Sequence, residues 1–186
     1  MMVEIDHCHL LSLGFGKVKI RDPEKTLREL RLVNDKAQLQ IVKAGLIAGP
    51  EHLRFAARNA LHSFKSKKPR SKSLAVEYLL YLSCQRQISK AIRFLGVQPS
   101  DDQIVLVALS DAKDPLEELE RASRTLLGNP DDRLVEIGSR QKLENIQRSY
   151  GISVREMEAA RFEEETDEQV VKRLIVERSA LLDLED

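Results

Sequence analysis

The segment spanning residues 71–96 constrains the fold more than any other part of this sequence, because its apolar residues recur at a helical period. Steps of three, four or seven residues place such positions on one face of an α-helix, which is then expected to be buried. The polar run 83–87 interrupts the pattern, so we predict two helices, at about 72–82 and 85–95, joined by a turn. A single long helix with a polar patch is the alternative. The apolar positions are Leu74, Tyr78, Tyr81, Ile88, Ile92 and Leu95.

Three residues next to these helices are expected to define their ends. The hydroxyl of Ser83 can accept a backbone N–H at the start of the second helix, and Gln87 can reach back over its first turn. Gly96 follows the last apolar position and is predicted to end the helix in a left-handed conformation.

Shorter apolar runs predict a sheet and further helices. Buried strands are expected at 39–48 and 103–109, an edge strand at 134–137, and two short strands around a turn at Gly14 to Gly16. The remaining helices are expected at 22–33, 50–64, 115–127, 139–150 and 166–182. We therefore predict an α+β fold in which residues 1–186 form a single domain, with a small mixed or antiparallel sheet of four to five strands packed with several helices.

The composition is typical of a soluble globular protein, with 42% hydrophobic and 32% charged residues. No apolar run approaches the roughly 20 residues of a membrane-spanning helix, and the first residues lack the pattern of a secretory signal. We expect a cytoplasmic protein with no membrane partner. Cys8 and Cys84 are too few for a disulfide framework and are expected to be reduced.

The net charge of zero conceals an uneven distribution. Between His52 and Phe94 the sequence contains ten lysine or arginine residues and a single acidic residue, Glu77. In residues 156–168, by contrast, acidic residues predominate. We expect the basic segment to attract polyanions, although exposed charges that only solubilise the surface are the alternative. The ten basic residues are Arg54, Arg58, Lys65, Lys67, Lys68, Arg70, Lys72, Arg86, Lys90 and Arg93.

Few residues suggest catalysis or metal binding. A strand would place His7 and His9 on the same face, but Cys8 would point away and no second pair of ligands follows, so we expect no metal site. Gly14 to Gly16 does not form a phosphate-binding fingerprint, and no nucleophile has a recognisable base beside it. We therefore expect no catalytic residues, no cofactor and no enzymatic activity.

Several positions follow the order that is typical of one family. They are Lys67-Lys68-Pro69, Glu77, Ser83, Ile88, Ala91-Ile92 and Gly96. With this order, and a compatible layout over nearly the whole chain, the sequence resembles the kinase-binding small subunit of the KEOPS complex, the CGI-type or PRPK-binding protein family, in an archaeal-like form. Archaeal members often carry glycine where this chain has Cys84.

The resemblance implies a non-catalytic subunit of the complex that installs threonylcarbamoyl on transfer RNA. Such a subunit binds and regulates the kinase-like ATPase subunit, recruits transfer RNA through its single-stranded acceptor end, and meets the rest of the complex indirectly. Cations would hold phosphates, Arg86 could bind them bidentately, and Leu95 would offer an apolar stacking surface. The nucleic-acid-binding residues expected are Lys65, Lys67, Lys68, Arg70, Lys72, Gln85, Arg86, Gln87, Lys90, Arg93 and Leu95.

Kinase binding requires an exposed apolar stripe, and the last helix has one by periodicity, as any core helix would. Its residues are Val170, Val171, Leu174 and Ile175. Two other functions remain open at this point. One is a small-molecule-binding or enzymatic α+β domain with a pocket around Ser83 to Gln87, and the other is a scaffold that binds the kinase without contacting RNA.

Overall fold

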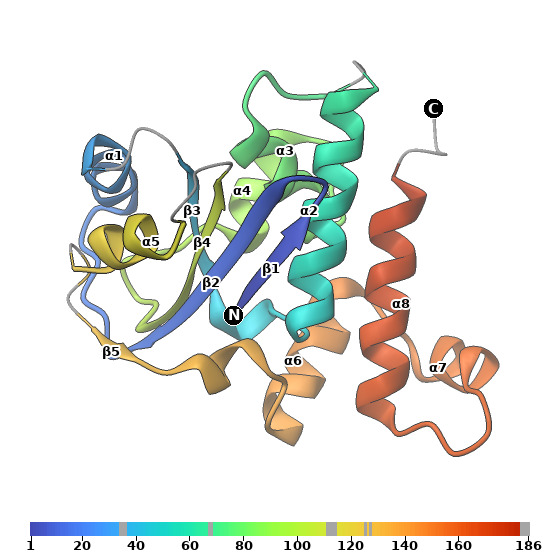
Figure 1. Cartoon of the computed structure of the whole chain (residues 1–186). Coiled ribbons are helices and arrows are strands. Elements are labelled where there is room, and N and C mark those ends of the chain that lie inside the picture. Colours follow the sequence, from blue (N-terminus) through green and yellow to red (C-terminus); the bar gives the residue numbers. More distant parts are fainter. Residues whose placement is uncertain (34–36, 67–68, 111–114, 125, 127, 183–186) are drawn as a thin grey trace.

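A computed structural model describes residues 1–33, 37–66, 69–110, 115–124, 126 and 128–182 (Figure 1). Within these residues the chain forms one antiparallel sheet of five strands and eight α-helices, which confirms the predicted α+β fold. The strands run in the order β1-β2-β4-β3, and β5 pairs with β2. Their bounds are β1 Met2–Ile5, β2 Cys8–Gly16, β3 Ala37–Lys43, β4 Gln103–Ser110 and β5 Asn129–Pro130.

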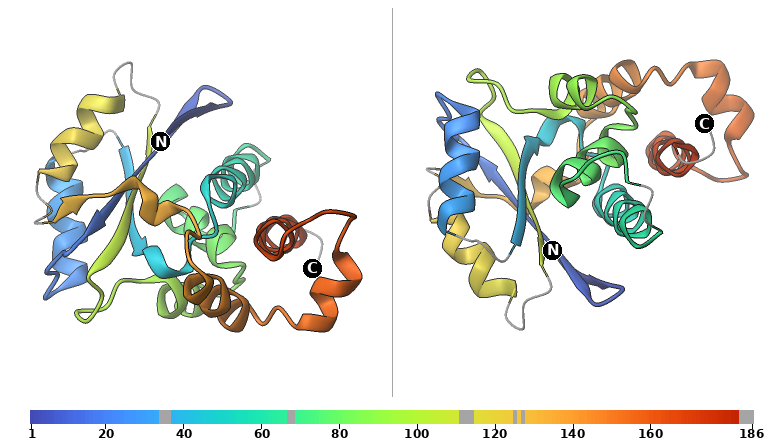
Figure 2. Two further views of the ribbon diagram at one scale, coloured as in Figure 1. Left: turned by 90° about the horizontal axis from the view of Figure 1, so that it is seen from below. Right: turned by 90° about the horizontal axis from the view of Figure 1, so that it is seen from above.

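Helices cover both faces of the sheet. Helices α1 and α5 lie on one face, α2 and α3 lie on the other, and α8 packs outside α2 (Figures 1 and 2). Strand β4 is apolar at nearly every position because alternate side chains enter two different cores: Val105 and Val107 face one, Ile104 and Leu106 the other. The helices are α1 Pro23–Val33, α2 Pro50–Lys65, α3 Leu74–Ser83, α4 Ile88–Leu95, α5 Pro115–Ser123, α6 Arg140–Tyr150, α7 Val154–Ala160 and α8 Asp167–Leu181.

The first hairpin differs from the prediction. Its turn lies at Asp6 and His7, which have positive φ values of 51° and 68°, while Gly14 and Gly16 belong to strand β2. A Cβ atom on Gly14 would lie 2.2 Å from the carbonyl oxygen of Asp131, so this glycine permits close approach of two backbones. The glycine-containing turn was therefore a wrong prediction, and residues 18–20 form no strand.

Two other strand predictions require correction. The apolar run 39–48 is a strand only as far as Lys43, and Ala44–Leu46 then forms a short 3-10 helix. The expected edge strand at 134–137 is absent, because Asp132–Val135 forms another 3-10 helix, which Asp131 caps by accepting the N–H of Arg133. Helix α7 was not predicted.

The two central helices are confirmed, but their ends are built differently from the prediction. Ser83 is the last residue of α3, and its hydroxyl donates to the carbonyl of Leu80 at 3.1 Å. Cys84 ends this helix in a left-handed conformation with φ 52°, which glycine adopts most readily. Gly96 is extended, with φ −62°, and its missing Cβ would lie 2.3 Å from the carbonyl oxygen of Ile92. The capping role predicted for Ser83 was wrong; Gly96 does end α4 as its C-cap, but not in the predicted left-handed conformation.

Helix α5 ends at Ser123, four residues before the predicted end, whereas α1, α2, α6 and α8 match the predicted ranges within one residue at each end. Ser139 caps α6 by accepting the N–H of Lys142, and Thr166 forms a reciprocal capping box with Gln169 at the start of α8. In the part of the chain that the structure describes, no helix combines the length and apolarity needed to cross a membrane.

Candidate nucleic-acid interface

Helix α4 presents a mixed basic and apolar surface. Ala91 and Leu95 anchor the helix in the core, and the cations Lys90 and Arg93, three residues apart, are exposed. Neither cation takes part in an ion pair with another described residue. Exposed Arg86 and Gln87 lie immediately before the helix. No acidic residue occurs in 86–95, so this surface keeps its positive charge.

The apolar part of this surface differs from the prediction. Leu95 is fully buried and offers no area for a base to stack on. Ile88 and Ile92 are 40% and 51% exposed and lie one helical turn apart, along one edge of the exposed half of α4 that also carries Lys90 and Arg93. The helical period placed Ile88, Ile92 and Leu95 together on a buried face, and of these three the structure buries only Leu95. We call Ile88, Lys90, Ile92 and Arg93 the α4 face.

The basic linker before α3 is only partly a free surface. Lys67 and Lys68 lie outside the described residues. Lys65 pairs with Asp6 at 3.1 Å, and Lys72 is exposed. Arg70 is half-buried: its Nη2 donates to the carbonyl of Leu182 at 2.6 Å, at the end of α8. The guanidinium of Arg70 therefore stabilises a helix terminus, where a cation is favourable.

A buried carboxylate holds the base of this linker. Glu77, the acidic residue of the basic segment, is completely buried. Its Oε1 accepts the hydroxyl of Ser63 at 3.0 Å, and its Oε2 accepts the backbone N–H of Ser71 at 2.8 Å. Glu77 thereby joins α2, the linker and α3, and it lies inside the molecule rather than among the exposed cations.

A cavity of about 290 Å³ lies beside the turn between α3 and α4, close to the pocket suggested around residues 83–87. The thiol of Cys84 lies against it and donates to the carbonyl of Ile175 at 3.6 Å. Burial raises the pKa of this thiol to about 12, so it stays protonated and is a poor nucleophile. The lining residues are Cys84, Gln85, Ser149, Tyr150, Arg178, Leu181 and Leu182.

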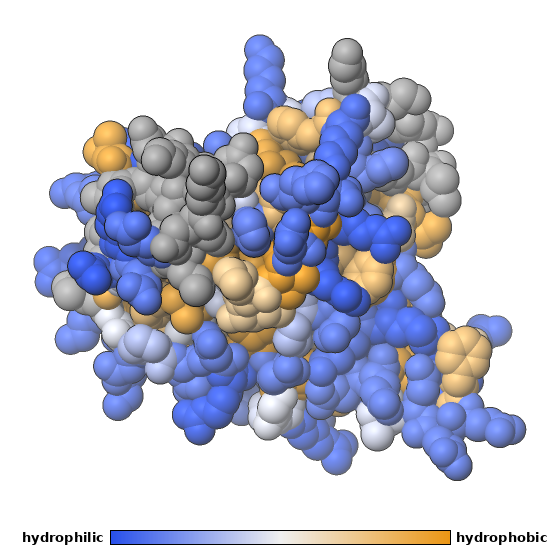
Figure 3. Space-filling view, in the orientation of Figure 1, coloured by the Kyte–Doolittle hydropathy of each residue, from blue (hydrophilic) through white to orange (hydrophobic). Residues whose placement is uncertain are grey.

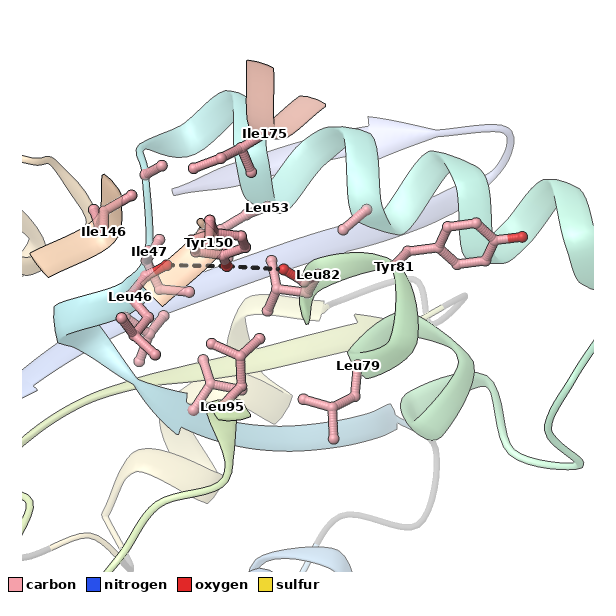
Figure 4. Close-up of a cluster of buried hydrophobic side chains, with 14 of the residues drawn as sticks. Leu46, Ile47, Leu53, Leu79, Tyr81, Leu82, Leu95, Ile146, Tyr150 and Ile175 are labelled. Atoms are coloured by element: carbon pink, nitrogen blue, oxygen red, sulfur yellow. Dashed lines mark hydrogen bonds between the residues drawn. The ribbon is translucent and has the colours of Figure 1, made fainter. Parts of the chain in front are cut away.

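The buried polar groups nearby are engaged in structural contacts. The hydroxyl of Tyr150 donates to the carbonyls of Leu46 and Leu82, at 3.3 and 3.1 Å (Figure 4). Nδ1 of His52 accepts the N–H of Ala48, so Nε2 carries the proton and donates to Leu82 at 2.8 Å. Burial lowers the pKa of His52 to about 4 and keeps the ring neutral. These groups position three segments, and their hydrogen bonds engage both the Tyr150 hydroxyl and the His52 ring.

The four apolar residues proposed for kinase contact lie in the core. Val170, Val171, Leu174 and Ile175 are all buried, on the side of α8 that packs against the rest of the molecule. The structure therefore supports the core-helix alternative, and these side chains provide no exposed stripe for a partner.

The sequence triplet at residues 7–9 does not gather metal ligands. His7 lies in the turn of the first hairpin with its side chain almost fully exposed, and His9 lies in β2. No cluster of three or more histidine, cysteine or acidic side chains suited to a metal occurs among the residues described.

Comparison with known proteins assigns the chain to a family. A family profile described as "Kinase binding protein CGI-121" matches residues 18–183, which include every helix and three of the five strands completely. The chain belongs to the CGI-121 family. The resemblance found in the sequence is thereby confirmed.

A curated relative agrees with this assignment. The KEOPS complex subunit Cgi121 of Pyrococcus abyssi is 31% identical over 100 residues, which is 54% of this chain and 55% of that protein. The alignment thus spans about half the length of this CGI-121 relative.

Another hollow of this CGI-121 protein lies away from the predicted residues. It has a volume of about 840 Å³ between the start of α6 and the segment before it. Lys142 lies in it and donates to the carbonyls of Leu134 and Glu136 at 2.7 and 2.8 Å. Burial lowers the pKa of Lys142 to about 8. Both signs of charge line this hollow, so it shows no preference for polyanions.

Proposed function

We propose that this CGI-121 protein is a non-catalytic subunit of a KEOPS-type complex. In this role it binds and regulates the kinase-like ATPase subunit and recruits transfer RNA through the single-stranded acceptor end, for threonylcarbamoyladenosine modification. Family membership and the name of the Pyrococcus abyssi relative support the kinase and the complex as partners. The α4 face supports the RNA contact.

The observation that carries the RNA contact is the juxtaposition of cations and exposed apolar side chains on one short helix. Lys90 and Arg93 can neutralise phosphates, and Arg86 precedes them in the turn. Ile88 and Ile92 supply an apolar area against which unpaired bases can pack, although aromatic side chains do so more strongly. A double helix hides its bases, so a surface of this kind favours a single-stranded end.

The test compares two variants with the same reversal of charge at two locations; in the control, Lys25 also loses its ion pair with Glu29 at 3.9 Å. Lys90→Glu/Arg93→Glu changes the α4 face, and Lys25→Glu/Arg28→Glu changes two exposed residues at the same spacing on α1, across the sheet (Figure 2). Binding is measured to a transfer RNA with an intact acceptor end, and to the same RNA without its last three unpaired nucleotides, over a series of salt concentrations.

We expect the α4 variant to lose at least about tenfold in affinity for the intact RNA, with the α1 variant close to the native protein. Removal of the three nucleotides should weaken native binding but leave the α4 variant unchanged. Both variants should still bind the kinase-like subunit. Equal losses in the two variants would show that the charge acts non-specifically, and full retention in the α4 variant would refute the proposed surface.

We assign kinase binding to the folded chain as a whole, and not to the four apolar residues of α8 named in the sequence analysis. Because those side chains are buried, polar substitutions there would reduce kinase binding by destabilising the fold. A scaffold role without RNA contact predicts kinase binding alone.

The cavity beside Cys84 favours the second candidate function, a small-molecule or enzymatic domain. Turnover of ATP, or tight binding of a metabolite, by the purified chain without partners would replace the non-catalytic proposal with this one.

A further inference from the structure

The acidic segment is mostly neutralised within the fold. Four of its carboxylates pair with basic residues: Glu156 with Arg178, Glu165 with Arg173, Asp167 with Arg161, and Glu168 with Lys172. The Glu165 and Arg173 side chains are 2.8 Å apart, and Arg178 contacts both carboxylate oxygens of Glu156. These contacts hold α7 and the following loop against α8.

Three carboxylates of this segment remain at the surface. Glu158, Glu163 and Glu164 are exposed and take part in no ion pair with any described residue. They lie on α7 and in the loop directly after it. Arg155 on α7 is also exposed, so these three negative charges and one positive charge leave a net negative charge at this end of the molecule.

Two large apolar side chains are exposed among these charges. Val154 at the start of α7 is 72% exposed, and Phe162 just beyond its end is 65% exposed, although Arg173 lies over the Phe162 ring at 4.4 Å. Met157 of the same helix is buried and anchors α7 in the core. Figure 3 shows an isolated hydrophobic spot surrounded by hydrophilic side chains over this region. We call Val154, Glu158, Phe162, Glu163 and Glu164 the α7 face.

The same molecule carries a surface of complementary chemistry. The α4 face also combines two exposed apolar side chains with uncompensated charges, but its charges are positive. We propose that the α4 face of one copy of this chain docks on the α7 face of a second copy. Apolar side chains would meet along one edge of the contact, and Lys90 and Arg93 would approach Glu158, Glu163 and Glu164 beside it, which sets the orientation of the two copies.

The predicted association joins two different surfaces, so it is head to tail. Each docked pair leaves one α4 face and one α7 face free, and further copies add as the concentration rises. Salt screens the charge pairs and weakens the contact. The inference does not depend on RNA binding, although RNA on the α4 face would compete with it.

The experiment is sedimentation equilibrium of the full chain over a range of concentrations at low and high salt. One variant carries Lys90→Glu/Arg93→Glu, and the other carries Glu158→Lys/Glu163→Lys/Glu164→Lys. All five substituted residues are exposed, so both variants are expected to fold, which far-UV circular dichroism and thermal unfolding verify. Lys25→Glu/Arg28→Glu on α1 is the control.

We expect the native protein and the α1 control to grow beyond the mass of one chain at low salt and to return to it at high salt. Each reversed variant alone brings like charges together and should stay monomeric. An equimolar mixture of the two restores opposite charges at every contact, and should associate again. A native protein that is monomeric under all conditions, or a mixture that stays monomeric, would overturn the proposal.

Discussion

Glu77 shows how one buried side chain organises the basic segment. Its two carboxylate oxygens accept hydrogen bonds from α2 and from the linker, while its own backbone lies in the first turn of α3. A carboxylate removed from water remains favourable only when hydrogen bonds satisfy it. The acidic residue in the middle of ten basic ones is thus explained by the architecture of the linker.

Removal of the Glu77 carboxylate should destabilise the fold. In Glu77→Ala the Ser63 hydroxyl and the Ser71 N–H lose the carboxylate that accepts from them in a buried site, so we expect a loss of about 2–4 kcal/mol in the free energy of unfolding. Urea denaturation at neutral pH measures it. Glu158→Ala, at an exposed position, is the matched control and should stay within about 0.5 kcal/mol of the native protein. Equal stability of the two variants would contradict the role of Glu77.

His52 should make part of the stability depend on pH. Burial lowers its pKa to about 4 in the folded state, against about 6.5 in an unfolded chain. As the pH falls from 6.5 to 4, the unfolded chain takes up this proton and the folded chain does not. Stability is therefore present above pH 6.5 and is lost on acidification, by up to about 3 kcal/mol.

The measurement is the free energy of unfolding between pH 7 and pH 4. His52→Gln should be less stable at pH 7, because the contacts to Ala48 and Leu82 are disturbed, and should show a shallower decline with acid. His62→Gln, at an exposed position on the same helix, should keep the native slope. Equal slopes for all three proteins would show that His52 is not responsible.

At the scale of elements, strand β2 contains two glycines that differ in the space available for a Cβ atom. A Cβ on Gly14 would lie 2.2 Å from the backbone oxygen of Asp131, whereas a Cβ on Gly16 would meet a methyl group of Leu134 at 3.8 Å, an ordinary contact. Gly14 and Asp131 are also hydrogen-bonded through their backbones, so neither segment can move away freely.

This difference predicts unequal effects of the same substitution in one strand. Gly14→Ala should lower the free energy of unfolding by about 2–4 kcal/mol, because the added methyl group must displace backbone. Gly16→Ala should cost less than about 1 kcal/mol. Thermal unfolding of the two variants makes the comparison, and a larger loss for Gly16→Ala would contradict the packing described.

The ends of the central helices illustrate a limit of local reasoning. Ser83 and Gly96 have the side chains that favour capping, yet Ser83 bonds backward within α3 and Gly96 is extended. Gly96 also forms a bridge with Val42 of β3, far away in the sequence. A tertiary contact of this kind determines the backbone conformation and overrides the local preference.

At the scale of the whole molecule, the layers decide which apolar stripe is available to a partner. Helix α8 packs on α2, outside the sheet and its first helical layer, so its stripe from Val170 to Ile175 is buried although the helix is peripheral (Figure 2). The amphipathic period is the same for a core helix and for a docking helix. The period alone therefore could not distinguish the two alternatives.

The whole molecule also decides which acidic side chains are paired and which are exposed. The run of acids after residue 155 is a single block in the sequence, but α8 supplies three cations that pair with it, Lys172, Arg173 and Arg178. Only the fold separates the paired carboxylates from the exposed Glu158, Glu163 and Glu164. The available negative charge is thus smaller and more localised than composition suggests.

The sequence by itself determined the family, the α+β class, the two central helices and the buried strand β4, because apolar periodicity and the order of residues are properties of contiguous segments. Only the tertiary structure decided which members of each apolar face meet solvent. Leu95 is buried while Ile92, three residues earlier, is half exposed, and Arg178 reaches Glu156 across 22 positions. Burial and ion pairing depend on segments that are distant in the chain, and no local pattern encodes their meeting.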